Sequence, residues 1–238
     1  MTVRETPPSA PSRPARVQPV NAETPDFIRA TRTAYDTIAE PYTEQFSDWA
    51  GIPTLDRAQI TGFAELVKEQ GKGPVADIGS GPGHVTAALH ELGVPVFGVD
   101  VSPKMVELAR RAHPELRFHV GSMTTLDLPS ETLGGITALY SIIHVPDDHL
   151  PQAFAEFHRV LTPGAHALIG FQYEPGGTHM HLDERFGHRI SLDYWLRAPE
   201  AVAGPLTQVG FQVTLRVLRE PLGEEKLSRA YLVARKPS

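Results

Sequence analysis

The sequence of 238 residues contains no cysteine. This absence excludes disulfides, thiolate catalysis and zinc–thiolate sites, and it leaves His, Asp and Glu as the available metal ligands. The sequence also lacks any apolar run near the ~20 residues that span a bilayer, and its N-terminus lacks the apolar core of a signal peptide. We therefore expect a soluble cytoplasmic protein with no membrane partner.

An excess of positive charge is missing as well. Lys and Arg number 22 against 28 Asp and Glu, which gives a formal net charge of -6. Proteins that follow a phosphate backbone usually carry a basic patch, so we expect no nucleic-acid partner. With 41% hydrophobic residues, the chain has enough apolar material for one α/β domain and a small appendage.

The N-terminal third divides into two segments. Residues 1–24 are rich in Pro, Ser, Ala and Arg and show no apolar periodicity, so we expect a disordered tail. Residues 25–71 follow a helical pattern, in which Phe27, Tyr35 and Tyr42 fall on roughly one face, and a second helix is predicted over 55–70. This segment is expected to form a helical cover.

From residue 72 the pattern alternates between strand and helix, which predicts a parallel sheet with crossover helices. The strands are predicted over residues 75–78, 94–100, 116–122, 134–141 and 165–172. A helix over 192–209 and two strands over 211–218 and 227–234 are predicted to follow, and the last two strands are close enough in sequence to pair antiparallel. We expect a doubly wound α/β domain.

A glycine-rich turn follows the first of these strands in "VADIGSGPGHV", residues 75–85. In open α/β sheets, ligands bind at the carboxyl ends of the strands, where glycines let the backbone approach closely. The G-x-G-x-x-G spacing of dinucleotide-binding proteins, counted from Gly79, would place its last glycine at His84, so nicotinamide binding is disfavoured. No Gly-Lys-Ser/Thr follows the loop, so a P-loop is excluded. A plain strand-to-helix turn is the alternative interpretation.

Five segments together extend this pattern over residues 74–171. Their order and spacing resemble those of the motifs of S-adenosylmethionine-dependent methyltransferases. The segments are "VADIGSGPGHV", "VFGVDVSPKMVELARR", "FHVGSMTTLDLP", "ALYSIIHVP" and "FHRVLTPGAHALIGF". The resemblance implies a Rossmann-like, doubly wound seven-stranded sheet with its last strand antiparallel, and an N-terminal helical cover. It also implies a methyltransferase domain over 72–238 with a lid insertion at about 172–191.

The resemblance implies S-adenosylmethionine as cofactor. Asp77 would shape the loop and attract the ammonium group of the cofactor, although an aspartate that only stabilises the turn is the alternative. Asp100, at the end of the second strand, would accept hydrogen bonds from the ribose hydroxyls. The family's usual acidic residue after the third strand is replaced by Gly121-Ser122. The other cofactor contacts implied are Tyr42, Gly79, Ser80, Gly81, Gly83, Val101, Met105, Ser122, Met123, Tyr140 and Ser141.

His144, in "SIIHVP", follows the fourth strand and is the expected general base, with Tyr35 from the cover helix as its catalytic companion. If His144 is not the base, the lid histidines His179, His181 and His188 are the alternatives. Spaced two residues apart, His179 and His181 are weak evidence for a metal site, so no metal is expected.

The predicted function is transfer of a methyl group to O, N or C of a small-molecule metabolite, with secondary metabolism as one setting. The alternative is a non-catalytic, S-adenosylmethionine-binding regulatory protein of the same fold, because fold alone does not decide function. The acceptor is not identified by the sequence, and a homodimer is one assembly that the sequence allows.

Overall fold

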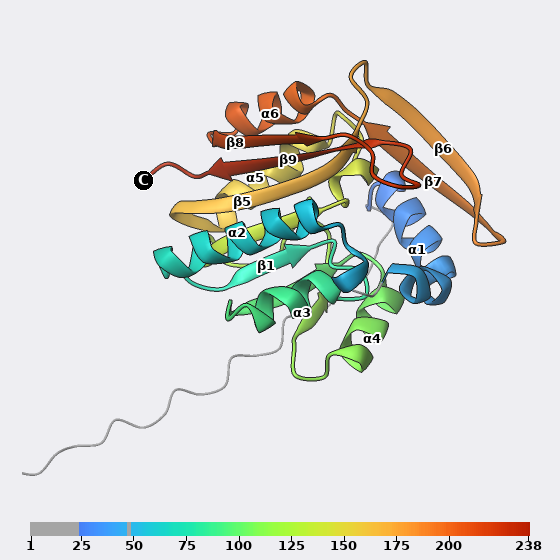
Figure 1. Cartoon of the computed structure of the whole chain (residues 1–238), viewed down its shortest axis with the longest axis horizontal. Coiled ribbons are helices and arrows are strands. Elements are labelled where there is room, and N and C mark those ends of the chain that lie inside the picture. Colours follow the sequence, from blue (N-terminus) through green and yellow to red (C-terminus); the bar gives the residue numbers. More distant parts are fainter. Residues whose placement is uncertain (1–23, 47–48) are drawn as a thin grey trace, which may run out of the picture.

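A seven-stranded sheet forms the centre of the computed structural model, which describes residues 24–46 and 49–238. The strand order is β3-β2-β1-β4-β5-β9-β8. Strands β1 to β5 run parallel, and the last strand, β9, runs antiparallel to both of its neighbours. This confirms the predicted sheet (Figure 1). The strands of the sheet are β1 (Val75–Ile78), β2 (Val96–Asp100), β3 (Phe118–Val120), β4 (Leu133–Leu139), β5 (Leu161–Tyr173), β8 (Gln212–Arg219) and β9 (Ser228–Arg235).

Helices cover both faces of the sheet, because its central strands are apolar on both sides. All four residues of β1 are buried, and alternate residues point to opposite faces. Ala76 belongs to the apolar cluster under α5 and α6, whereas Val75 belongs to the cluster under α2 and α3. The helices are α1 (Asp26–Phe46), α2 (Thr54–Gln70), α3 (His84–Glu91), α4 (Pro103–Ala112), α5 (Leu150–Val160) and α6 (Pro199–Gln208), with short 3-10 turns η1 (Trp49–Gly51) and η2 (Ile142–His144).

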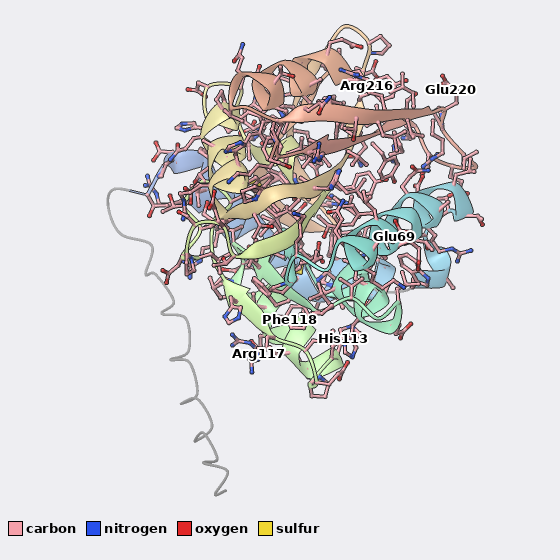
Figure 2. All side chains as sticks on the ribbon, turned by 90° about the vertical axis from the view of Figure 1, so that its left-hand side faces the viewer. Glu69, His113, Arg117, Phe118, Arg216 and Glu220 are labelled. Carbon is pink, nitrogen blue, oxygen red and sulfur yellow. The ribbon has the colours of Figure 1, made fainter. Side chains whose placement is uncertain are left out.

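Phe118 on β3 explains one of the loop glycines. Its ring packs among α3, α4 and β3 (Figure 2), and a Cβ added to Gly83 would lie 2.7 Å from that ring. Gly83 also has a φ of 91°, which residues with a side chain rarely adopt. Gly83 therefore lets α3 start directly after the loop and pack closely against the β3 end of the sheet.

A separate antiparallel hairpin, β6 (Thr178–Arg185) and β7 (His188–Leu196), lies beside α1 (Figure 1). We call this hairpin the lid. The helix predicted to begin at Leu192 is wrong over its first seven residues, since β7 continues to Leu196 and α6 starts at Pro199. Ala198 is extended because it precedes a proline, and Pro199 favours the first helical position.

The cover helix α1 is present from Asp26 to Phe46, as the sequence predicts. Its Asp36 accepts hydrogen bonds from the Ser102 hydroxyl at 2.6 Å and the Lys104 amide at 3.1 Å, so α1 is tied to the first turn of α4. The predicted disordered tail falls, apart from Thr24, outside the described residues. Within the described ranges, no helix combines the length and apolar character needed to cross a bilayer.

Candidate functional site

A cavity of about 730 Å³ opens at the carboxyl edge of the sheet, between the ends of β1, β2 and β4 and the cover helix α1. Its place is the one at which open α/β sheets bind ligands. Twelve of the residues predicted for the site line it: Tyr35, Tyr42, Gly79, Gly81, Asp100, Val101, Met105, Ser122, Met123, Tyr140, Ser141 and His144.

The glycine loop passes close beneath this cavity. Gly79 has a φ of 77°, and a Cβ added there would lie 2.3 Å from the Cβ of Ser141, a distance that atoms cannot share. The side chain of Ser141 fills that space and donates its hydroxyl to the Ile78 carbonyl at 2.9 Å. A larger residue at position 79 would therefore separate the end of β1 from the end of β4 and deform the cavity floor.

Asp100 is the one carboxylate among the residues that line the cavity. It accepts a hydrogen bond from the Gly81 amide and one from the Ser102 amide, both at 2.8 Å, through different oxygens. Burial raises its pKa to about 6 against the lowering effect of these two bonds. Each carboxylate oxygen has a second lone pair, so Asp100 can still accept two hydroxyl donors from a ligand.

Asp77 behaves differently, although it is only two residues before Gly79. It accepts hydrogen bonds from the hydroxyls of Thr86 at 2.7 Å and Thr137 at 2.8 Å, which join β1 to α3 and β4. It is 2% exposed, burial raises its pKa to about 6, and it does not line the cavity. Ser80 and Gly83 likewise lie outside the lining.

His144 and Tyr35 are brought together as the sequence predicts, with the Tyr35 hydroxyl 2.8 Å from Nε2 of His144. The other ring nitrogen, Nδ1, lies 2.8 Å from the backbone carbonyl of Asp193. A carbonyl only accepts, so Nδ1 carries the proton, Nε2 has the free lone pair and Tyr35 donates to it. Burial lowers the pKa of His144 to about 4 and raises that of Tyr35.

Arg197 holds the turn that carries His144. Its guanidinium is buried, donates to the carbonyls of Ile142 and Val145 on either side of His144, and pairs with Asp147 at 2.5 Å. These contacts connect the end of the lid to η2. The imidazole is therefore positioned from both sides, by Arg197 through the backbone and by Asp193 through Nδ1.

The lid adds Arg185 and Tyr194, which the sequence interpretation did not assign to the site. The Tyr194 ring lies 4.6 Å from the His144 ring between centroids, and its hydroxyl accepts from Arg185 at 2.5 Å. The alternation of Leu192, Tyr194 and Leu196 was a strand signal that could have placed Tyr194 on the inner face. Nothing in the sequence singled out Arg185 among the charges of this segment.

The lid histidines lie on the outside of the hairpin. His179 Nε2 and His181 Nδ1 both contact Oδ1 of Asp193, at 2.9 and 2.8 Å, and both histidines are exposed. The shared carboxylate raises the pKa of His181. No cluster of three or more ligand-type side chains suited to a metal ion occurs in the described part of the chain.

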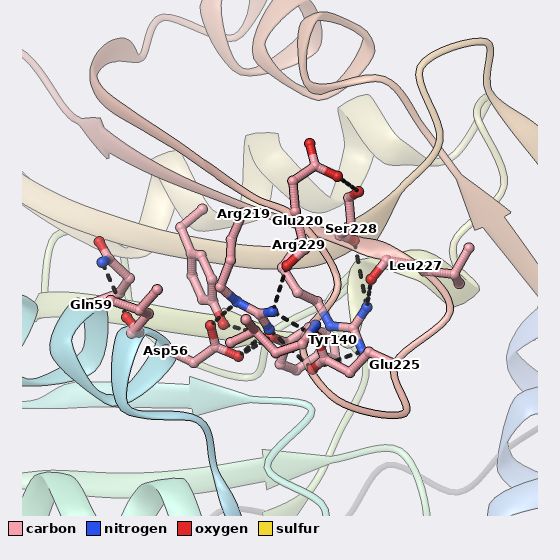
Figure 3. A network of polar contacts seen from close by, with 12 residues as sticks. Asp56, Gln59, Tyr140, Arg219, Glu220, Glu225, Leu227, Ser228 and Arg229 are labelled. Atoms are coloured by element: carbon pink, nitrogen blue, oxygen red, sulfur yellow. Dashed lines mark hydrogen bonds and ion pairs between the residues drawn. The ribbon is translucent and has the colours of Figure 1, made fainter.

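Tyr140, at the end of β4, is held by a polar network on its far side (Figure 3). It has a φ of 54°, which is rare for a residue with a side chain, and its hydroxyl lies 2.5 Å from that of Tyr231 and 3.4 Å from Asp56. Asp56 in turn forms a buried, bidentate pair with Arg219, at 2.7 and 2.8 Å. This network joins α2, β4, β8 and β9 and fixes the strained cavity floor.

Part of the chain is similar in sequence to known methyltransferases. Residues 75–164 match a sequence family described as a methyltransferase domain. Over 96 residues the chain is 32% identical to demethylmenaquinone methyltransferase of Chlorobaculum parvum, which covers 40% of this chain and 39% of the relative. It is 29% identical over 153 residues to ubiquinone biosynthesis O-methyltransferase of Xanthomonas oryzae, covering 53% and 61%. The matches thus span less than two thirds of these relatives' lengths.

A solved structure extends the likeness beyond the matched segment. The 1,6-didemethyltoxoflavin-N1-methyltransferase of Burkholderia thailandensis, with 1,6-didemethyltoxoflavin and S-adenosylhomocysteine bound, has a TM-score of 0.67 and 20% identity, covering 94% of both chains. At this identity the likeness establishes the fold. The chain therefore resembles a methyltransferase domain over residues 75–164, and this segment is set within a Rossmann-like seven-stranded fold.

Proposed function

We propose that this protein transfers a methyl group from S-adenosylmethionine to O, N or C of a small-molecule metabolite. The observation that carries the proposal is a single cavity with Asp100 and the glycine loop at one end and the Tyr35–His144 pair at the other. A carboxylate and a neutral imidazole whose unprotonated Nε2 accepts from Tyr35 thus face the same space. The methyltransferase names of the relatives support the same activity.

The residues around the loop suit such a cofactor, which would supply an activated methyl group on a sulfonium. Asp100 would accept the ribose hydroxyls with the lone pairs that Gly81 and Ser102 leave free. Asp77, Ser80 and Gly83, which lie outside the lining, would hold the loop in shape. Val101, Met105, Ser122 and Met123 would line the adenine, and Tyr42, Gly79, Gly81, Tyr140 and Ser141 the methionine part.

At the other end of the cavity, His144 would act as general base through Nε2, either directly or through the Tyr35 hydroxyl. Asp193 fixes the tautomer that leaves Nε2 unprotonated. The cover helix and the lid would exclude water and orient the acceptor at a near-attack distance of roughly 3 to 3.5 Å. The cytoplasmic location, the homodimer and the absence of nucleic-acid binding stay predictions from the sequence.

The test combines binding with turnover. We would titrate S-adenosylhomocysteine into the full chain by calorimetry, and incubate the chain with methyl-labelled S-adenosylmethionine and candidate acceptors that include demethylmenaquinone and 1,6-didemethyltoxoflavin. Labelled product from the wild type, lost in His144→Ala, is the expected result. Tight binding without turnover on a broad metabolite panel favours the non-catalytic alternative, and no binding rejects the cofactor assignment.

A further inference from the structure

Arg185, the last residue of β6, is a charged side chain that the proposed mechanism does not yet use. Its guanidinium donates to the Tyr194 hydroxyl and lies 5.5 Å from the ring centroid of Tyr42, 5.7 Å from that of Phe46 and 5.0 Å from that of Phe186. Tyr42 lines the cavity, and Tyr194 packs on His144. The cation therefore lies directly behind the aromatic wall at the lid end of the cavity.

Arg185 differs from the other arginines of this region in its ion pairing. Among residues 24–46 and 49–238, no carboxylate forms an ion pair with it, whereas the buried guanidiniums of Arg197 and Arg219 both have carboxylate partners. Arg229, which lies 5.7 Å over the Tyr140 ring, is paired with Glu225 at 3.3 Å. An arginine in an aromatic shell without a carboxylate is an available site for an anionic ligand, because its planar fork matches carboxylate oxygens.

The cavity itself supplies no competing cation. Its lining contains neither Lys nor Arg. Burial, and to a smaller extent the nearby Arg185, lower the pKa of His144 to about 4 against the raising effect of the hydrogen bond to Asp193. The imidazole is therefore neutral at neutral pH. Arg185 also opposes the burial that raises the pKa values of Tyr35 and Tyr42, which means that its field reaches both hydroxyls.

Hydrogen bonds join Arg185 to Tyr194, Tyr194 to Tyr35, and Tyr35 to His144. Arg185 can only donate, so the Tyr194 oxygen accepts from it. A hydrogen bond to Tyr35 is among the contacts that lower the pKa of Tyr194 against burial. The Tyr35 proton points to His144. Because Tyr35 donates to His144, Tyr194 donates to the Tyr35 oxygen, and the guanidinium and the two phenols form one chain of donors that ends at His144 in the cavity.

We infer that Arg185, together with Tyr35 and Tyr194, forms the acceptor-recognition site and selects small acceptors that carry an anionic oxygen group, either a carboxylate or an ionised phenol. This inference rests on the proposed function, because it names the substrate class of the same cavity. An acceptor of this kind replaces His144 as the partner of the Tyr35 proton and gives Arg185 a counter-charge that none of the described residues supplies. Charge-assisted hydrogen bonds of this type are about twice as strong as neutral ones.

The experiment measures binding of anionic probes and their neutral analogues. Benzoate against benzamide tests a carboxylate, and 4-nitrophenolate against 4-nitroanisole tests a phenolate, each titrated at pH 8 into the full chain saturated with S-adenosylhomocysteine. In the wild type we expect at least one anion to bind more tightly than its neutral analogue. Arg185→Met should lower the affinity for that anion by roughly 10- to 100-fold and leave the affinity for the neutral analogue within about twofold of the wild type.

Arg189→Met is the matched control, because Arg189 lies exposed on the same hairpin and loses the same charge. It should keep the anion preference, and Arg185→Lys should keep part of it, since a lysine retains the charge without the planar fork. Should Arg185→Met fail to fold, as judged by its thermal midpoint against Arg189→Met, the partial loss in Arg185→Lys decides the question.

The inference is overturned if neither anion is preferred, if the preference survives in Arg185→Met, or if Arg189→Met removes it equally. A loss of S-adenosylhomocysteine affinity in Arg185→Met would assign Arg185 to the cofactor and also overturn it. A wild type that does not bind S-adenosylhomocysteine at all rejects the proposed function separately. The probe titrations are then repeated without it and judged by the same criteria.

Discussion

The two ends of the cavity are built in different ways. At the glycine-loop end, short segments after consecutive strands supply the groups, and backbone amides satisfy the key carboxylate, Asp100. At the lid end, residues 35, 144, 185 and 194 come from α1, η2 and the lid, and they contact one another mainly through side chains. One end is fixed by the topology of the sheet, whereas the other exists only when three distant segments have packed together.

This difference separates binding from chemistry. Changes at the glycine-loop end should alter cofactor affinity, while changes at the lid end should alter turnover and acceptor choice with the cofactor still bound. Substitutions that behave otherwise would show that the two ends are not independent. The following predictions test this separation, from the largest expected effect to the smallest.

The largest effect is expected for His144→Ala. Removal of a positioned general base lowers the turnover rate by roughly 10²- to 10⁴-fold, because the acceptor proton loses its partner at Nε2. Affinity for S-adenosylhomocysteine should stay within about threefold of the wild type, since His144 bonds to Tyr35 and Asp193 and to no residue of the glycine loop. Single-turnover kinetics with labelled cofactor and calorimetry give the two values.

His179→Ala is the control for this variant, because His179 is exposed on the lid, where its ring contacts the Asp193 carboxylate and the Trp195 ring. It should turn over at close to the wild-type rate. If His144→Ala also keeps near wild-type turnover with a true acceptor, His144 is not the base.

The second effect concerns Asp100→Ala at the other end. Two charge-assisted hydrogen bonds to ligand hydroxyls contribute about 1.5 to 3 kcal/mol each before water compensates, so affinity for S-adenosylhomocysteine should fall between several-fold and about a hundredfold. Calorimetry on folded protein, confirmed by circular dichroism, measures this loss. Unchanged affinity would remove Asp100 from the cofactor site.

Asp77→Ala provides the contrast within the same loop. Its two partners, the hydroxyls of Thr86 and Thr137, would be left buried without an acceptor. Such groups cost about 1 to 3 kcal/mol, so the free energy of unfolding should drop by that amount in urea titrations. The residual folded protein should bind S-adenosylhomocysteine better than Asp100→Ala does. The reverse order of affinities would mean that Asp77 contacts the cofactor directly.

The same contrast explains what the sequence could predict. The sheet, its antiparallel last strand and Ser102 as the start of α4 follow from local signals: apolar strands, glycine turns and helix caps. Local signals are enough here, because parallel strands bring their carboxyl ends to one edge of the sheet, so residues that follow the strands must lie near one another. The contact between Tyr35 and His144 joins distant segments and was expected from the resemblance of the cover helix to the family, without a local signal.

The lid could not be predicted in the same way. The residues of β6 are mostly exposed, so its alternation of apolar and polar residues is weak, and the last part of β7, from Leu192, was assigned to a helix. The contact between Asp193 and His144 uses a backbone carbonyl, which any residue possesses and no sequence pattern reveals. Arg185 became informative only once the structure showed that no carboxylate in the described part of the chain forms an ion pair with it.

The smallest effect is a pH dependence that isolates Asp100. Burial raises its pKa to about 6, so below pH 6 the carboxyl takes up a proton and loses part of its capacity to accept ligand hydroxyls. Affinity for S-adenosylhomocysteine should be constant from pH 7 to 8 and fall by up to about tenfold per pH unit below 6. The matched variant Asp100→Asn, which cannot ionise, should bind more weakly but show a flat profile through this range.

The free energy of unfolding should change with pH in the opposite direction to the ligand affinity, so the loss of affinity can be distinguished from acid unfolding. Asp77 and Asp100 have pKa values near 6 in the folded protein, above their ordinary value of 3.8, so the folded state binds these protons more tightly than the unfolded state. Their protonation therefore adds to the free energy of unfolding as the pH falls from above 6 towards 4. A loss of affinity at pH 5 that coincides with a fall in thermal midpoint of the ligand-free protein, equal in wild type and Asp100→Asn, would contradict the assignment to Asp100.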